Sequence, residues 1–251
     1  MIVTGIDPFS QTWRRDGVLN EPRELGVKPI DGTTVLVSMT DDQCPCCGGI
    51  ENSNAESERS ENRWISGASP LESELPPELQ SALRRFLGVE SVETLGGWAS
   101  EVRDRTGGGS ITVDDLCLTD EETVHRGTVG DEQYHFACFY DAVILAALSD
   151  SPVDVWTKSP DGTVIEARAV GTEELTVRPS EAVFSFGIDD AVAPPADGED
   201  PSLERGYAAI CPYVNAFPTP VVYEEWAKSV SAATVAMPLE GATDLAAELV
   251  R

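Results

Sequence analysis

The chain has 251 residues, of which 41% are hydrophobic, and it carries a formal net charge of -27 at pH 7. This hydrophobic content is enough for a buried core, and the length allows one large domain or a compact domain with appendages. A surface so acidic repels phosphate backbones and anionic lipids, so we expect neither nucleic-acid binding nor membrane-surface binding. We interpret the acidity as that of a halophilic, salt-adapted surface.

Residues 1–74 are predicted to form a flexible N-terminal extension. They contain a Cys-Pro-Cys-Cys cluster and the polar, aromatic-free run "ENSNAESERSEN". Met39 opens a stretch typical of a natural start, so residues 1–38 are interpreted as an upstream extension or a loose arm. The chain opens with neither a basic region followed by an apolar one nor a membrane-length apolar run, and we expect a cytoplasmic protein.

Residues 75–110 are predicted to be a small helical subdomain. In "PPELQSALRRFLG", two prolines mark a helix start, Gly88 marks its end, and the apolar residues fall on one face. A second helix is expected over residues 91–105, before three consecutive glycines.

Residues 111–251 are predicted to hold a sheet with flanking helices. Alternating residues and turn signals over residues 110–139 indicate strands, and residues 141–150 change to helical character. A hairpin is expected around Pro160-Asp161-Gly162, followed by strands at residues 174–179 and 182–188. Residues 189–206 look like an acidic loop, and residues 221–230 like an amphipathic helix. The predicted fold is α+β: a small N-terminal helical part followed by a mixed or antiparallel β-sheet core.

The chain has six cysteines, which we expect to be reduced thiols for metal binding or catalysis. Cys138 and Asp141 lie three positions apart, so a helix through both would place them on one face. Taken alone, this pair favours a structural role, with a buried cysteine and an aspartate that caps the helix. A second thiol nearby, Cys211, would create a two-sulfur site with an acid beside it, which suits a soft ion such as Hg(II) or Cu(I).

Three segments carry a family resemblance. "YHFACFYDAVILAAL", "LTVRPSEAVF" and "ICPYVNAFPTPVVYEEWAKS" occur in this order between about residues 130 and 235, and together they resemble the catalytic domain of organomercurial (alkylmercury) lyases. The resemblance implies that Cys138 and Cys211 bind mercury and that Asp141 handles a proton. It also implies cleavage of a carbon-mercury bond to a hydrocarbon and Hg(II), by a catalytic domain over residues 111–251. Departures from the family pattern are His135 and Ala137, where aromatic residues are usual, and Pro212.

The resemblance further implies an organomercurial substrate, no organic cofactor, Hg(II) as bound product and free thiols as co-reactants. A mercuric reductase is a candidate acceptor of Hg(II), and the oligomeric state is left open.

The front thiols Cys44, Cys46 and Cys47 lie outside this resemblance. They could be accessory thiols that relay mercury, a mobile cluster, or a zinc half-site that needs Cys117 or a second chain. Two alternative functions therefore stay open: a non-catalytic soft-metal (Hg or Cu) binding protein of the same fold, and a thiol redox or sensor protein.

Overall fold

The computed structural model describes residues 63–65, 69–105, 111–196 and 200–251. Cys44, Cys46, Cys47, the possible start at Met39 and most of the predicted extension lie outside the described residues. Within the described part of the chain, no helix has the length and apolar character needed to cross a bilayer.

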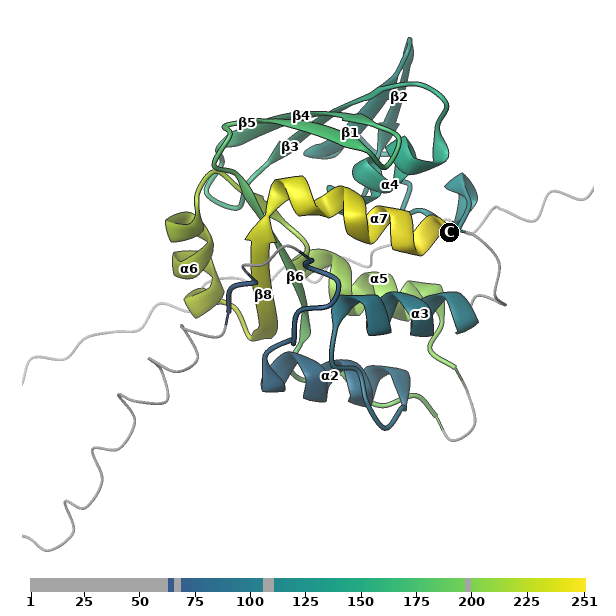
Figure 1. The fold of residues 1–251 in the computed structure, drawn as a ribbon, viewed down its shortest axis with the longest axis vertical. Helices are drawn as coiled ribbons and strands as arrows, with labels where there is room; N and C mark the ends of the chain where they lie inside the picture. The colour runs from purple at the N-terminus through teal and green to yellow at the C-terminus, as the bar shows by residue number, and fades with distance from the viewer. Residues whose placement is uncertain (1–62, 66–68, 106–110, 197–199) are drawn as a thin grey trace, which may run out of the picture. The chain divides into compact units, whose positions relative to one another are not determined.

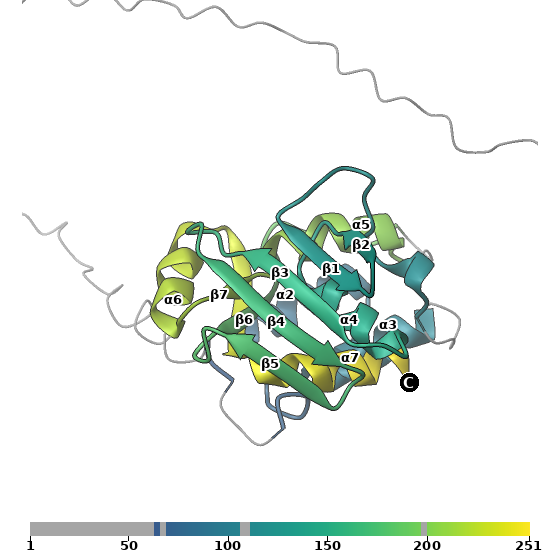
Figure 2. The same cartoon turned by 90° about the horizontal axis from the view of Figure 1, so that it is seen from above.

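A five-stranded antiparallel sheet forms one layer (Figure 2). Its order is β2-β1-β3-β4-β5, with bounds β1 His125–Val129, β2 Glu132–His135, β3 Val153–Lys158, β4 Val164–Val170 and β5 Glu174–Arg178. Along β3, Val153 and Val155 are buried while Asp154 is exposed, so one face of the sheet packs on the core. The predicted hairpin turn joins β3 to β4, and Gly162 adopts the left-handed conformation there, with φ of 89°.

A second antiparallel sheet has the order β7-β6-β8, with bounds Ala216–Phe217, Val183–Asp189 and Ala232–Pro238. Strand β6 is central, and its residues are buried from Val183 to Ile188 because the sheet is covered on both faces. Gly187 permits a close approach: an added Cβ would lie 2.7 Å from Thr234 Cγ2 and 3.1 Å from Tyr213 Cβ.

The helices fill the space around the two sheets (Figure 1). Helices α4 and α7 pack on each other beneath the five-stranded sheet, and α3 packs on α7, whereas α2, α5 and α6 contact the second sheet. One buried hydrophobic cluster includes residues of both sheets and of helices α2, α3, α4, α5 and α7, and a second, smaller cluster packs α6 against the three-stranded sheet. The bounds are α2 Pro77–Leu87, α3 Leu95–Arg105, α4 Tyr140–Leu148, α5 Leu203–Ile210, α6 Pro220–Ser229 and α7 Ala242–Val250, with 3-10 turns η1 Val113–Asp115, η2 Cys211–Tyr213 and η3 Leu239–Gly241.

These elements confirm the predicted α+β class, with both sheets antiparallel. Helix α2 ends at Gly88 in the left-handed conformation, as expected. The expectation that residues 189–206 are loop throughout is wrong at its end. Helix α5 begins at Leu203, because the Ser202 side chain caps it by accepting a hydrogen bond from the Arg205 N–H. The domain boundaries at residues 74 and 110 stay a prediction.

Candidate metal and acid site

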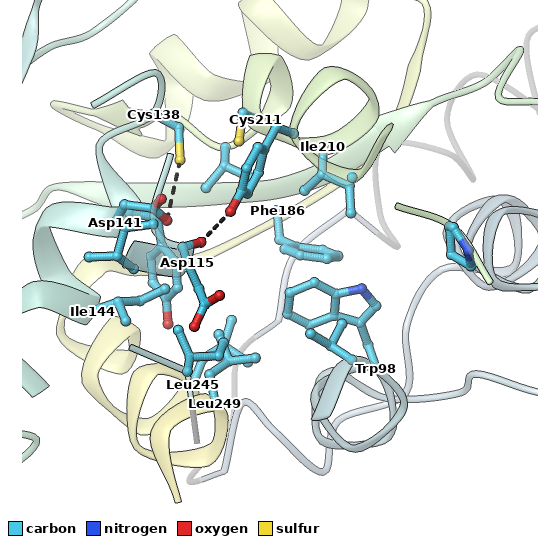
Figure 3. A pocket seen from close by; sticks show the side chains of 18 of the residues that line it. Trp98, Asp115, Cys138, Asp141, Ile144, Phe186, Ile210, Cys211, Leu245 and Leu249 are labelled. Carbon is cyan, nitrogen blue, oxygen red and sulfur yellow. Dashed lines mark hydrogen bonds between the residues drawn. The ribbon is translucent and has the colours of Figure 1, made fainter. Parts of the chain in front are cut away.

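Cys138 and Asp141 meet at the start of α4. The helix begins at Tyr140, so Cys138 lies just before it rather than on a shared helix face. Its Sγ nevertheless lies 3.9 Å from Asp141 Oδ1, within the range of a sulfur hydrogen bond (Figure 3). The predicted proximity is therefore present, although a turn before the helix creates it and not the helix itself.

Cys211 comes to the same place from a distant part of the chain. It caps the end of α5 and opens the 3-10 turn η2, where Pro212 supplies a fixed φ. The turn is attached to β6 because the Ser185 hydroxyl donates to the Tyr213 carbonyl at 2.8 Å. Cys138, Asp141 and Cys211 all line one cavity.

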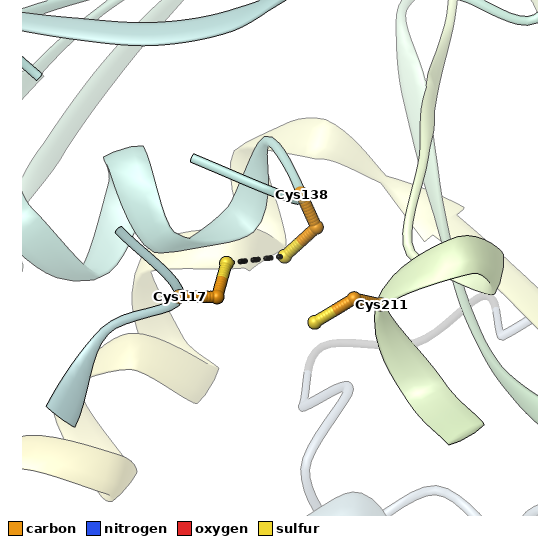
Figure 4. Close-up of side chains that lie close together, drawn as sticks. All are labelled: Cys117, Cys138 and Cys211. Atoms are coloured by element: carbon orange, nitrogen blue, oxygen red, sulfur yellow. Dashed lines mark hydrogen bonds between the residues drawn. The ribbon is translucent and has the colours of Figure 1, made fainter. Parts of the chain in front are cut away.

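A third thiol, Cys117, joins them (Figure 4). The three sulfurs lie within 4.8 Å of one another, and those of Cys117 and Cys138 are 3.9 Å apart. All three cysteines are free. From the sequence, Cys117 was expected only as a possible zinc-ligand partner of Cys44, Cys46 and Cys47. Its position beside Cys138 depends on a contact between distant parts of the chain. The antiparallel bridge between Leu118 and Phe136 aligns the segment of Cys117 with the segment of Cys138.

The Asp141 carboxyl group is buried, with 8% of the residue exposed. Its Oδ2 accepts the backbone N–H of Cys117 at 2.5 Å. Burial raises the pKa of this carboxyl well above its usual value, and the nearby charge of Cys117 adds to the shift. The group can thus take up and release a proton closer to neutral pH than an ordinary aspartate.

The thiols divide their charge unequally. Hydrogen bonds from Cys138 and then Cys211 hold the pKa of the Cys117 thiol well below its usual range. The same interaction with Cys117 raises the pKa of Cys138 and that of Cys211. Thiols this close titrate as one coupled unit, in which Cys117 is the thiol favoured to ionise first.

The cavity has a volume of about 620 Å³ and a mostly apolar wall. Helices α3 and α7 contribute Trp98, Leu245 and Leu249, and Phe186 packs edge-on against Trp98 with ring centroids 4.7 Å apart (Figure 3). Tyr207 also lines the cavity, where its hydroxyl donates to the carbonyl of Asp115. Burial raises the pKa of this phenol, which keeps it neutral.

Comparison with known protein families identifies the family of the chain. The family model described as alkylmercury lyase matches residues 118–251. The chain belongs to the alkylmercury lyase family. No match was found among curated proteins. One solved structure, the mercury-bound form of MerB2, is 16% identical with a TM-score of 0.40, and the match covers 78% of this chain and 97% of that one.

The departures from the alkylmercury lyase pattern lie away from the cavity wall. Ala137 is exposed, and its N–H donates to the Cys117 carbonyl at 2.9 Å. His135 is half-buried and accepts the N–H of Thr123 at Nδ1. Pro212 is exposed. None of the three is among the described residues that line the cavity.

Proposed function

We propose that the protein is an organomercurial lyase that cleaves carbon-mercury bonds by protonolysis. Cys138 and Cys211 serve as the sulfur ligands of mercury, and Asp141 serves as the acid. The observation that carries this proposal is that two thiols and a buried carboxyl group line one apolar cavity, with Cys138 and Asp141 coming from one segment and Cys211 from a distant one.

The first step attaches mercury to the protein. Cys138 passes its proton to Asp141 across the 3.9 Å contact, and the resulting thiolate attacks RHg⁺ delivered on a small thiol. A sulfur-mercury bond to the protein forms, the bond to the carrier breaks, and the carrier leaves as a thiolate that takes a proton from solvent.

The second step breaks the carbon-mercury bond. Cys211 releases its proton to solvent and donates a sulfur electron pair to mercury, which weakens the bond to carbon. Asp141 then gives its proton to carbon, and the electron pair of the carbon-mercury bond becomes the carbon-hydrogen bond. The hydrocarbon leaves, the carboxylate is regenerated, and Hg(II) stays on two thiolates.

The raised pKa of Asp141 supports this role, because an acid that both accepts and donates a proton works best when its pKa is near the working pH. The cavity supports it too. Its volume of about 620 Å³ falls in the range of roughly 300–1,000 Å³ usual for small-molecule sites. Its apolar wall suits an alkyl or aryl group.

Hg(II) leaves by exchange onto free thiols, which act as co-reactants. A mercuric reductase is the proposed acceptor of the ion, and the reaction uses no organic cofactor.

Phenylmercury incubation tests the proposal. Reduced protein with phenylmercuric acetate and excess cysteine should release benzene, measured by headspace gas chromatography, in many turnovers. Cys138→Ser and Cys211→Ser should each abolish release. Benzene at the rate of a protein-free thiol control would contradict the enzyme function.

The second candidate is a non-catalytic protein that binds soft metals. The additional thiol of Cys117 favours it, because protonolysis as written needs only two sulfurs. This candidate predicts stoichiometric Hg(II) binding with no hydrocarbon release in the same assay.

A further inference from the structure

Cys117 has no part in the two-sulfur reaction, yet the fold holds it firmly beside the site. Its carbonyl accepts the N–H of Ala137 at 2.9 Å, and its own N–H donates to Asp141 Oδ2. The neighbouring Thr119 N–H donates to the His135 carbonyl at 3.0 Å. These hydrogen bonds therefore fix the position of the backbone from which the Cys117 side chain projects.

The spacing of the three sulfurs matches a three-coordinate metal ion. Metal-sulfur bonds of about 2.3 Å, as in zinc thiolate sites, hold three coplanar sulfurs about 4 Å apart. The Cys117 and Cys138 sulfurs are 3.9 Å apart, and all three lie within 4.8 Å of one another. A disulfide requires only about 2.05 Å between sulfurs, so the Cys117-Cys138 spacing is that of ligands and not of a bonded pair.

Core packing alone accounts poorly for this arrangement. A buried cysteine can replace a small apolar residue, but that role needs no other sulfur nearby. Here three side chains from separate segments turn their sulfurs toward a common point (Figure 4). Among the described residues, the cavity wall includes Cys138 and Cys211 but not Cys117. An organomercurial in the cavity thus meets the sulfurs of Cys138 and Cys211, whereas the Cys117 sulfur is close to both but is not part of the cavity wall.

We propose that Cys117 is the third sulfur ligand of Hg(II) in this protein, so that the metal product is held by Cys117, Cys138 and Cys211 together. The inference rests on the proposed function only for the source of the ion. As the hydrocarbon leaves, the Cys117 sulfur binds the two-coordinate Hg(II). Any proton still on that thiol passes to solvent, and the site becomes a trigonal tris-thiolate with one negative charge. Small thiols must then displace three sulfurs, so Cys117 slows release of the product.

X-ray absorption at the mercury edge tests this assignment directly. The sample is full-length reduced protein carrying Cys44→Ser, Cys46→Ser and Cys47→Ser, loaded with less than one equivalent of HgCl₂ and freed of added thiol. We expect three sulfur neighbours around mercury. In the same background, Cys117→Ser should give two, with loss of the ultraviolet charge-transfer absorption of the three-sulfur site.

Two results would overturn the inference: two sulfurs in the protein that retains Cys117, or three sulfurs that persist in Cys117→Ser. The first measurement decides the matter even if Cys117→Ser does not fold, which circular dichroism would reveal. Both use Hg(II) alone, so they are independent of the benzene assay. A protein that releases no hydrocarbon can still show three sulfurs, and an active enzyme can show two.

Discussion

Burial of the Asp141 carboxyl group favours its use as a proton donor and lowers the stability of the folded state. Its carboxyl group is 8% exposed, and burial raises its pKa. Below the unfolded-state value of 3.8, both states are protonated and no penalty exists. As pH rises above that value, the unfolded chain ionises first, so the folded state loses relative stability until the folded pKa is passed.

Asp141→Asn should therefore separate the two effects. The amide oxygen can still accept the Cys117 N–H, while the ionisable proton is gone. At pH 7 we expect benzene release to fall by about 100-fold or more, with Hg(II) binding retained. The free energy of unfolding at pH 7 should rise, because the variant has no carboxyl group whose ionised form is disfavoured by burial in the folded state.

Urea titrations at pH 7 and pH 4 measure the stability effect, and the gain should shrink at the lower pH. Full activity of Asp141→Asn would show that another group supplies the proton. A gain equal at both pH values would show that the carboxyl group is not strained in the folded state.

The family resemblance was sufficient to predict Cys138, Asp141 and Cys211 as a group, because each lies in one of the segments that carry it, whereas residue types and spacing alone favoured a buried cysteine and a helix cap. Cys117 could not be predicted in this way. Its approach depends on the bridge between Leu118 and Phe136, a contact between segments with no shared motif. A site residue can thus be predicted from the sequence when it lies in a recognisable segment. It cannot be predicted when only pairing between distant segments brings it to the site.

At the scale of elements, β6 determines where Cys211 lies. Ser185 anchors the turn η2, and Gly187 lets Tyr213 pack on the strand, where a Cβ would lie 3.1 Å from that side chain and 2.9 Å from the Ala233 carbonyl. The backbone oxygen cannot move without disturbing the β6-β8 pairing. A glycine of the second sheet therefore supports the position of a thiol in the site.

Gly187→Ala should lower the free energy of unfolding by roughly 1–3 kcal/mol, the usual cost of overpacking a core. Displacement of η2 should also reduce benzene release. Gly97→Ala is the matched control, because Gly97 is exposed in helix α3 and an added Cβ would lie 3.4 Å from Thr94 Oγ1. It should be neutral or stabilise by about 0.5–1 kcal/mol. Equal effects of the two substitutions on urea midpoints would refute the packing argument.

Elements with strong local signals were predictable. Helix α2 has prolines at its start and Gly88 at its end, and the β3-β4 hairpin has Asp161-Gly162 in its turn. Helix α5 was missed because its start follows a Pro- and Asp-rich run, although Ser202 is a good N-cap. Strand β8 and helix α7 were also not predicted. Both are recognised through packing: β8 pairs with β6, and α7 lies against α3 and α4.

At the scale of the whole molecule, the high negative charge is the main electrostatic influence on stability. The net charge of -27 acts against a compact state through repulsion among carboxylates. The ion pairs identified among the described residues are few beside that charge, and in one of them, Arg168 with Asp154, both side chains are exposed. An exposed pair of this kind contributes about 1 kcal/mol at most, which is little against the repulsion.

Salt should therefore stabilise the protein. The screening length shortens from about 10 Å at 0.1 M salt to about 3 Å at 1 M. The melting temperature at pH 7 should therefore rise by several degrees between these KCl concentrations. Near the isoelectric point of about 4.2 the effect should be much smaller, because the net charge is close to zero. A melting temperature that is constant or falls with KCl at pH 7 would show that charge repulsion is not limiting.

The three clustered thiols come from the segment before β1, the turn before α4 and the turn after α5. An ion bound among them is a cross-link that exists only in the folded chain, since unfolding scatters its donors along the sequence. By mass action such a ligand draws the population toward the folded state. Bound Hg(II) would thus stabilise the folded protein, and the melting temperature should rise as Hg(II) is added.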